Sequence, residues 1–171
     1  MNSNTCLKDL KGSGCPVNVI EHSKAVSKKA VEMAVNYSRI NGINMDMVQI
    51  ECGALLHDIG RSKTHTIKHA VVGAEILRKL NYPDSIVKIT LKHVGAGIPQ
   101  YEAEKLGLEP GNYMPATIEE KIVAHADNLI RGTKEVGIDS VIIRWEKIFG
   151  KDHPAITRLK NLHKELIPED P

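Results

Sequence analysis

The chain has 171 residues, of which 42% are hydrophobic and 26% are charged, and this length and composition fit one globular domain with its own core. Its formal charge is only +2, and its basic residues are scattered among acidic ones, which disfavours binding to long nucleic acid. Since no segment has a signal-peptide run or the roughly 20 apolar residues of a membrane span, we expect a cytoplasmic protein without membrane contact.

Apolar spacing and helix-capping residues predict helices along most of the chain. Asp46 is a candidate N-cap, and Thr117 with Glu120 has capping-box spacing. No strand pair, repeat or linker is evident, so we expect a single all-α domain with its core at about residues 16–135 and C-terminal helices at about 138–167. The expected helices lie at residues 16–41, 46–60, 69–80, 84–93, 100–106, 117–130, 140–149 and 154–166.

The helix that opens at Thr117 should place Asp127 in its middle. In the first C-terminal helix, Trp145 is expected to pack in the core with Ile142, Ile148 and Phe149 rather than to form a platform for stacking bases.

Histidine is the unusual residue type in this composition. The chain has 8 histidines and 3 cysteines, and the cysteines lack the CxxC spacing of a zinc knuckle, so free thiols are expected. Five of the histidines lie on or beside predicted helices: His22, His57, His69, His93 and His125.

The adjacent His57 and Asp58 are the strongest candidates for chemistry. They follow the apolar run Leu55-Leu56 and precede Gly60, and polar side chains at the edge of a core are costly unless they are used. With one histidine about 35 positions earlier and one aspartate about 70 later, they supply two imidazoles and two carboxylates from three helices. This mixed nitrogen and oxygen set suits a borderline divalent ion, with Fe(II) or Mn(II) favoured and Co(II), Ni(II) or Zn(II) acceptable.

The motif His57-Asp58-Ile59-Gly60 resembles the HDIG form of the HD phosphohydrolase superfamily, an all-helical bundle. The segments HAVVGAEIL from His69, KHVGAG from Lys92 and EEKIVAHADNLIRG from Glu119 extend the similarity to small archaeal HDIG proteins over nearly the whole chain. These resemble iron-dependent phosphodiesterases that open dihydroneopterin 2′,3′-cyclic phosphate, and HD hydrolases that cleave dinucleoside tetraphosphates.

The resemblance implies that His22, His57, Asp58 and Asp127 hold a catalytic metal ion. Asp58 would also accept the proton of the attacking water, while the ion lowers the pKa of that water and polarises a phosphoryl oxygen. His69 and His93 match positions that contact phosphate in one branch and bind a second ion in two-metal relatives. Both roles remain open, with a slight preference for phosphate contact and one ion.

Three basic residues are candidates for holding the substrate's phosphate. Arg61 and Lys63 follow the metal pair directly and provide a bidentate guanidinium and a point charge, although a solvated basic turn is the simpler alternative. Arg131, one turn after Asp127, is a weaker candidate because its spacing departs from that of the tetraphosphatases. His125 should face away from Asp127 and is interpreted as structural.

These residues predict an enzyme that hydrolyses a phosphoester of a small molecule, either a cyclic phosphate or a nucleotide, with metal-activated water. Two alternatives from other classes are a non-catalytic HD sensor that binds a metal or nucleotide, and a di-iron oxygenase. The sequence does not predict the oligomeric state.

Overall fold

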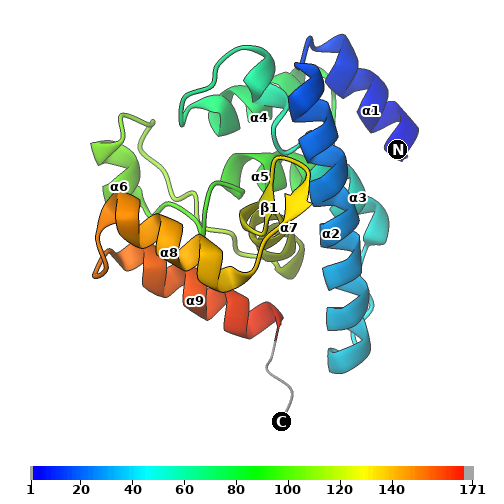
Figure 1. Cartoon of the computed structure of the whole chain (residues 1–171). Coiled ribbons are helices and arrows are strands. Elements are labelled where there is room, and N and C mark those ends of the chain that lie inside the picture. Colours follow the sequence, from blue (N-terminus) through cyan, green and yellow to red (C-terminus); the bar gives the residue numbers. More distant parts are fainter. Residues whose placement is uncertain (1, 168–171) are drawn as a thin grey trace.

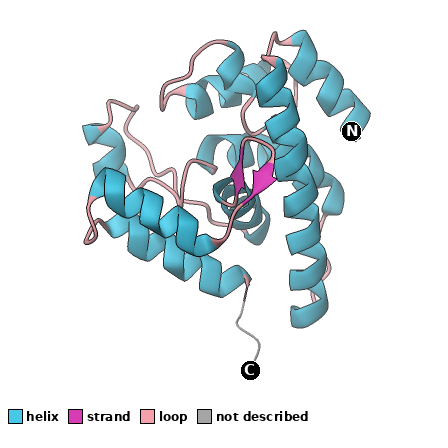
Figure 2. Ribbon diagram, in the orientation of Figure 1, coloured by secondary structure: helices cyan, strands magenta, loops and turns pink. Residues whose placement is uncertain are grey.

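The computed structural model describes residues 2–167, which form mainly α-helices (Figures 1 and 2). The helices are α1 (Ser3–Gly12), α2 (Val17–Asn41), α3 (Met47–Leu56), the 3-10 helix Ile59–Ser62, α4 (His69–Lys79), α5 (Asp84–Lys92), α6 (Gln100–Lys105), α7 (Ile118–Asn128), α8 (Ile138–Phe149) and α9 (Pro154–Leu166). The strands β1 (Ile130–Arg131) and β2 (Lys134–Glu135) pair antiparallel, a short hairpin that was not predicted. Because helices make up nearly all of the regular structure, the predicted all-α class is confirmed.

The capping residues act as their sequence positions predicted. The side chain of Asp46 accepts a hydrogen bond from the backbone N–H of Gln49. Thr117 and Glu120 form a complete capping box at the start of α7. Gly42 ends α2 with a φ of 64°, a left-handed conformation that costs glycine little.

Three local features differ from the predictions. Helix α1 was not predicted; Asn2 caps it by accepting a hydrogen bond from the backbone N–H of Thr5, and only Cys6 and Leu10 of its residues are buried. Helix α3 ends at Leu56 rather than near Gly60. Helix α7 ends at Asn128 rather than near 130 because the chain turns into the β1–β2 hairpin, and Asp127 therefore lies in the last turn of α7.

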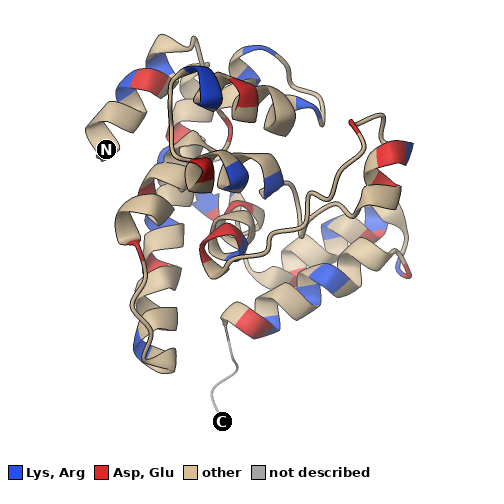
Figure 3. Cartoon of the chain, turned by 180° about the vertical axis from the view of Figure 1, so that it is seen from behind, with Lys and Arg blue, Asp and Glu red and all other residues tan. Residues whose placement is uncertain are grey.

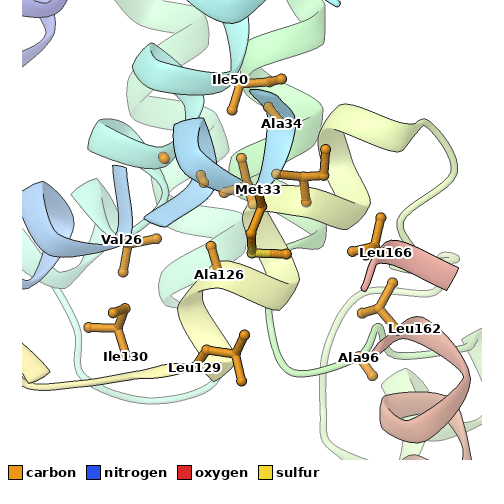
Figure 4. Packing of buried hydrophobic residues seen from close by; sticks show 14 of the residues in the cluster. Val26, Met33, Ala34, Ile50, Ala96, Ala126, Leu129, Ile130, Leu162 and Leu166 are labelled. Atoms are coloured by element: carbon orange, nitrogen blue, oxygen red, sulfur yellow. The ribbon is translucent and has the colours of Figure 1, made fainter. Parts of the chain in front are cut away.

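The core is built from two large apolar clusters on either side of α3 and α5. One cluster joins α2, α3, α7, α8 and α9. Figure 4 shows Met33 of α2 near Ala126 of α7, with Leu129, which follows α7, and Leu162 and Leu166 of α9 in the same cluster. The other joins α1 to α2, α3, α4 and α5. All three cysteines are free and buried, as expected.

The apolar face of α8 differs from its prediction. Trp145 is buried, as predicted, but Ile148 and Phe149 are 63% and 49% exposed. The predicted burial of these two residues is therefore wrong. They follow Trp145 by three and four positions and lie in the last turn of α8.

Charges of both signs are interspersed over the helices when the chain is seen from behind (Figure 3). No helix within residues 2–167 combines the length and the apolar character that crossing a membrane would need.

Gly60 allows the 3-10 helix to lie directly against the start of α4. A Cβ atom added at Gly60 would lie 1.9 Å from the carbonyl oxygen of His69 and 2.6 Å from the backbone nitrogen of Gly73. Only a residue without a side chain fits such an approach. This contact brings the segment of His57 and Asp58 beside the first turn of α4, which carries His69.

We expect Gly60→Ala to lower the free energy of unfolding by about 3 kcal/mol or more, because the new methyl group meets backbone atoms that cannot rotate away. Gly12→Ala is the matched control, since a Cβ at Gly12 would meet no atom within 4 Å. Urea denaturation followed by circular dichroism measures both. Equal stability of the two variants would contradict the close approach.

Candidate metal centre

The four residues predicted to hold a metal ion converge from separate helix ends. His22 lies in the second turn of α2, His57 caps the C-terminus of α3, and Asp58 begins the 3-10 helix. His22 Nε2 lies 2.9 Å from Asp127 Oδ1. His57 Nε2 lies 3.5 Å from the same oxygen and 3.7 Å from Asp58 Oδ2. The structure therefore brings all four side chains to one place.

His69 and His93 lie on the other side of Asp58. Their Nε2 atoms are 3.0 Å apart, and they lie 3.2 and 3.5 Å from Asp58 Oδ1. Asp58, His69 and His93 thus form a second group whose ligand atoms lie within 4.8 Å of one another, and His22, His57 and Asp58 form a first group of the same kind. Asp58 belongs to both groups.

Backbone carbonyls fix the orientation of each of these histidines. The Nδ1 atoms of His57, His69 and His93 each donate to the carbonyl three residues earlier, at distances of 2.6 to 2.8 Å. His22 Nδ1 donates to the carbonyl of Gly132, at 2.8 Å. Because a carbonyl only accepts, Nδ1 carries a proton in each ring, and Nε2 faces the centre. This arrangement is typical of metal-binding histidines.

The buried charges of the centre stabilise one another. Burial alone would lower the pKa of His57, but Asp58 and Asp127 outweigh it and raise the pKa to about 9. Burial would raise the pKa of Asp58, but His57, His69 and His93 hold it well below its usual range. Asp127 also has a lowered pKa, because its hydrogen bond with His22 and the nearby His57 outweigh its burial. Both carboxylates are therefore ionised and need positive charge nearby.

Two polar atoms at the centre lack hydrogen-bond partners among the described residues. They are His57 Nε2 and Asp58 Oδ1, both buried. An unsatisfied buried polar atom costs about 1 to 3 kcal/mol. The donor set of imidazole nitrogens and carboxylate oxygens fits a divalent cation, which would satisfy both atoms at once.

The three predicted phosphate-binding residues occupy different positions around the centre. Arg61 donates its Nε–H to Asp58 Oδ2 at 2.6 Å and so lies beside the metal-binding side chains. Lys63 is exposed at the end of the 3-10 helix, and Arg131 is exposed in β1. Arg131 directly precedes Gly132, whose carbonyl holds His22.

His125 lies apart from the centre, as predicted. It is buried, and its Nε2 atom is 2.9 Å from His163 Nδ1 of α9. Burial, with a smaller effect from His163, lowers the pKa of His125 to about 3, so its ring is neutral at pH 7. Its role is to join α7 to α9.

The role of Gly132 was not predicted from the sequence. Residues Gly132 and Thr133 form the turn between β1 and β2, in which Ile130 pairs with Glu135 and Arg131 with Lys134. Gly132 has a φ of 64°, as two-residue hairpin turns require. The glycine was a visible signal for a turn, but its distance of 110 positions from His22 left no sign that the two residues meet.

Comparison with known proteins assigns the family. Residues 19–132 match the family model of the HD domain, and this range contains every residue of the centre. The chain belongs to the HD-domain family. Helices α8 and α9 lie outside the matched range of the HD domain.

Relatives of this HD protein include both short and long chains. It is 53% identical over 152 residues to uncharacterized protein MJ0778 of Methanocaldococcus jannaschii, covering 89% of each chain. It is also 45% identical over 161 residues to a tRNA (cytidine(56)-2′-O)-methyltransferase of Picrophilus torridus. That alignment covers 94% of this chain but 45% of the methyltransferase, so the chain spans less than half the length of that relative.

Among solved structures, the HD domain of the Listeria monocytogenes phosphodiesterase PgpH, in complex with cyclic-di-AMP, has the same fold. The TM-score is 0.57, the sequence identity is 18%, and the match covers 98% of this chain and 99% of that one. At this level of identity the similarity establishes the fold alone.

We expect metal binding at pH 7 to release about one proton or more per chain, because the raised pKa of His57 keeps it protonated in the metal-free protein and a ligand must be neutral. For the same reason the affinity should increase as the pH rises toward 9. Calorimetric titration with Mn(II) in buffers of different ionisation enthalpy measures the released protons. The variant His65→Ala, which removes an exposed histidine, should release the same number. Heats that do not depend on the buffer would contradict the prediction.

Proposed function

We propose that this HD protein is a divalent-metal-dependent phosphohydrolase that uses water to cleave a phosphoester of a small molecule, either a cyclic phosphate or a nucleotide. The observation that carries the proposal is the convergence of four oriented histidines on two ionised carboxylates, those of Asp58 and Asp127. A structural core has no use for so many unsatisfied polar atoms.

His22, His57, Asp58 and Asp127 would hold the catalytic ion, and Fe(II) or Mn(II) suits this mixed set of nitrogen and oxygen ligands. A bound divalent ion lowers the pKa of water and polarises a phosphoryl oxygen, which is the chemistry that phosphoester hydrolysis needs. The chain therefore needs no side-chain nucleophile of its own. Asp58, at the centre of both groups, is placed to orient the attacking water and to accept its proton.

Arg61 is the basic residue best placed to bind the substrate's phosphate. Its hydrogen bond to Asp58 fixes the guanidinium beside the ion-binding side chains, where it can offset charge that develops on phosphoryl oxygens. Lys63 and Arg131 are exposed and would act at longer range, by attracting an anionic substrate.

For His69 and His93 we propose that they would hold a second ion together with Asp58, in place of the phosphate contact preferred from the sequence. Their Nδ1 atoms are both occupied as donors, so two Nε2 lone pairs face each other at 3.0 Å. Such an arrangement is repulsive unless a proton or a cation lies between the rings. The adjacent Asp58 Oδ1, which lacks a partner among residues 2–167, supports a cation.

Two of the relatives guide the choice of substrates to be tested. The PgpH domain was solved with cyclic-di-AMP, and a tRNA methyltransferase includes a segment similar to this chain. Purified protein loaded anaerobically with Fe(II) or Mn(II) should therefore be screened against cyclic nucleotides, 2′,3′-cyclic phosphates, mononucleotides and dinucleoside polyphosphates. Turnover without oxygen would exclude the oxygenase alternative, and metal-dependent binding without turnover would support the sensor.

We expect Asp58→Ala to abolish phosphoesterase activity and to lower the metal content while leaving the helical content largely unchanged. The reason is that Asp58 serves both ion-binding groups and contributes little apolar packing. Activity, metal analysis and circular dichroism are measured together, with exposed Asp152→Ala as the control. His57→Ala should behave like Asp58→Ala. Loss of helicity comparable to that of a core truncation would argue for a structural role.

The double change of His69 and His93 to Ala distinguishes the two roles of these residues. If they hold a second ion, the metal content should fall from near two ions per chain to near one, and turnover should fall steeply. If they contact only phosphate, the wild type should hold about one ion, the double variant should keep it, and substrate binding should weaken. Elemental analysis of both proteins decides between these outcomes.

A further inference from the structure

A cavity of about 320 Å³ lies between α6, α8 and the turn that follows α5. Its volume is at the lower end of the range for small-molecule pockets, about 300 to 1,000 Å³. Most of the residues around it are apolar, including Ile98, Leu106, Trp145 and Phe149. Figure 1 shows α6, α8 and α9 at one end of the molecule, away from α1 and α3.

The cavity adjoins the candidate metal centre through two short segments of chain. Val94 and Gly95, which line it, directly follow His93, and Ile67 precedes His69 by two residues. Two residues span at most about 7 Å, so these walls begin close to the histidine pair. A substrate that extends from a phosphate held at the candidate metal centre therefore has this cavity within reach.

Two aromatic side chains form part of the cavity wall. Trp145 packs against the turn, since a Cβ at Gly95 would lie 3.2 Å from the Cη2 atom of its indole ring. Phe149 lies edge-on to Trp145, with ring centroids 6.0 Å apart. It also stacks on His153, another residue of the cavity wall, with ring centroids 5.1 Å apart, and its side chain stays 49% exposed. Exposed aromatic surface of this kind is suited to stacking against a planar ring.

The cavity wall also contains a fixed ion pair. Arg158 of α9 donates its terminal amino groups to both carboxylate oxygens of Glu102, at 2.9 and 2.5 Å. This ion pair fixes the guanidinium, and the buried Nε–H has no partner among the described residues. Apolar walls with a few fixed polar groups are the usual composition of a ligand pocket.

We propose that this cavity binds the planar heteroaromatic group of the substrate, such as a nucleobase. Trp145 and Phe149 provide apolar contact, and the Arg158–Glu102 ion pair provides a fixed polar edge. The inference rests on the proposed phosphohydrolase function for the position of the phosphate. Since α8 and α9 lie outside residues 19–132, which match the HD domain, the cavity would give this chain a specificity that the shared ligand set does not determine.

The single tryptophan of the chain provides a direct test, because Trp145 lines the cavity. Titration of the purified full-length chain with adenosine, guanosine or AMP should change the tryptophan fluorescence in a saturable way. Ribose and ribose 5-phosphate, which lack the base, should leave it unchanged. A response to ribose 5-phosphate equal to that of AMP, or no response to any base, would overturn the proposal.

Phe149→Ala should weaken the binding of AMP by at least about fivefold, because stacking of a base on an aromatic ring is lost. The matched control is Ile148→Ala, which removes an exposed apolar side chain of the same helix that does not line the cavity. It should bind AMP like the wild type. Light scattering gives the molar mass of each variant. A dimer that dissociates in Phe149→Ala, together with no effect on AMP binding, would make the surface an interface between copies and overturn the proposal.

Turnover assays separate this proposal from the proposed function. If the metal-loaded chain hydrolyses phosphoesters with and without a base equally well, and no base alters the fluorescence, the phosphohydrolase function stands and the pocket assignment fails. If bases bind and Phe149→Ala weakens them, but no phosphoester is hydrolysed, the pocket assignment stands and the phosphohydrolase function fails.

Discussion

The ionised carboxylate of Asp58, buried at the meeting point of several helix ends, is the constraint on which the rest of the centre depends. A buried charge is tolerated only when it is paired and hydrogen-bonded. Here His57, His69, His93 and Arg61 surround it. His57 and Arg61 are close to Asp58 in the sequence, whereas His69 and His93 come from α4 and from the end of α5, so the packing of α3, α4 and α5 is arranged around one charge.

This constraint explains why the polar residues lie where helices end. His57 and His93 are C-caps of α3 and α5, and His69 is the first residue of α4. At such positions an imidazole can donate to a nearby carbonyl without disturbing helical hydrogen bonds, and its other nitrogen stays available. The centre contains buried polar atoms without hydrogen-bond partners among the described residues, which lowers the stability of the fold. The apolar clusters on both sides of it provide the stability that offsets this cost.

The residues that would bind metal lie in the matched HD domain, whereas part of the wall of the proposed substrate pocket comes from the C-terminal helices. The ligand set and its supporting carbonyls lie within residues 19–132. Helices α8 and α9 add Trp145, Phe149 and Arg158 beside the segment that follows His93. Chemistry shared within a family and selectivity for a particular substrate can therefore change independently.

The sequence by itself determined the helical class and the metal-binding candidates, because apolar periodicity, caps and the His57-Asp58 pair are local signals. It did not determine which distant atoms meet. The carbonyl of Gly132 that orients His22, the lone pairs of His69 and His93 at 3.0 Å, and the exposed position of Phe149 beside a cavity all depend on contacts between remote segments. Only the tertiary structure decided these features, since they result from how whole helices pack.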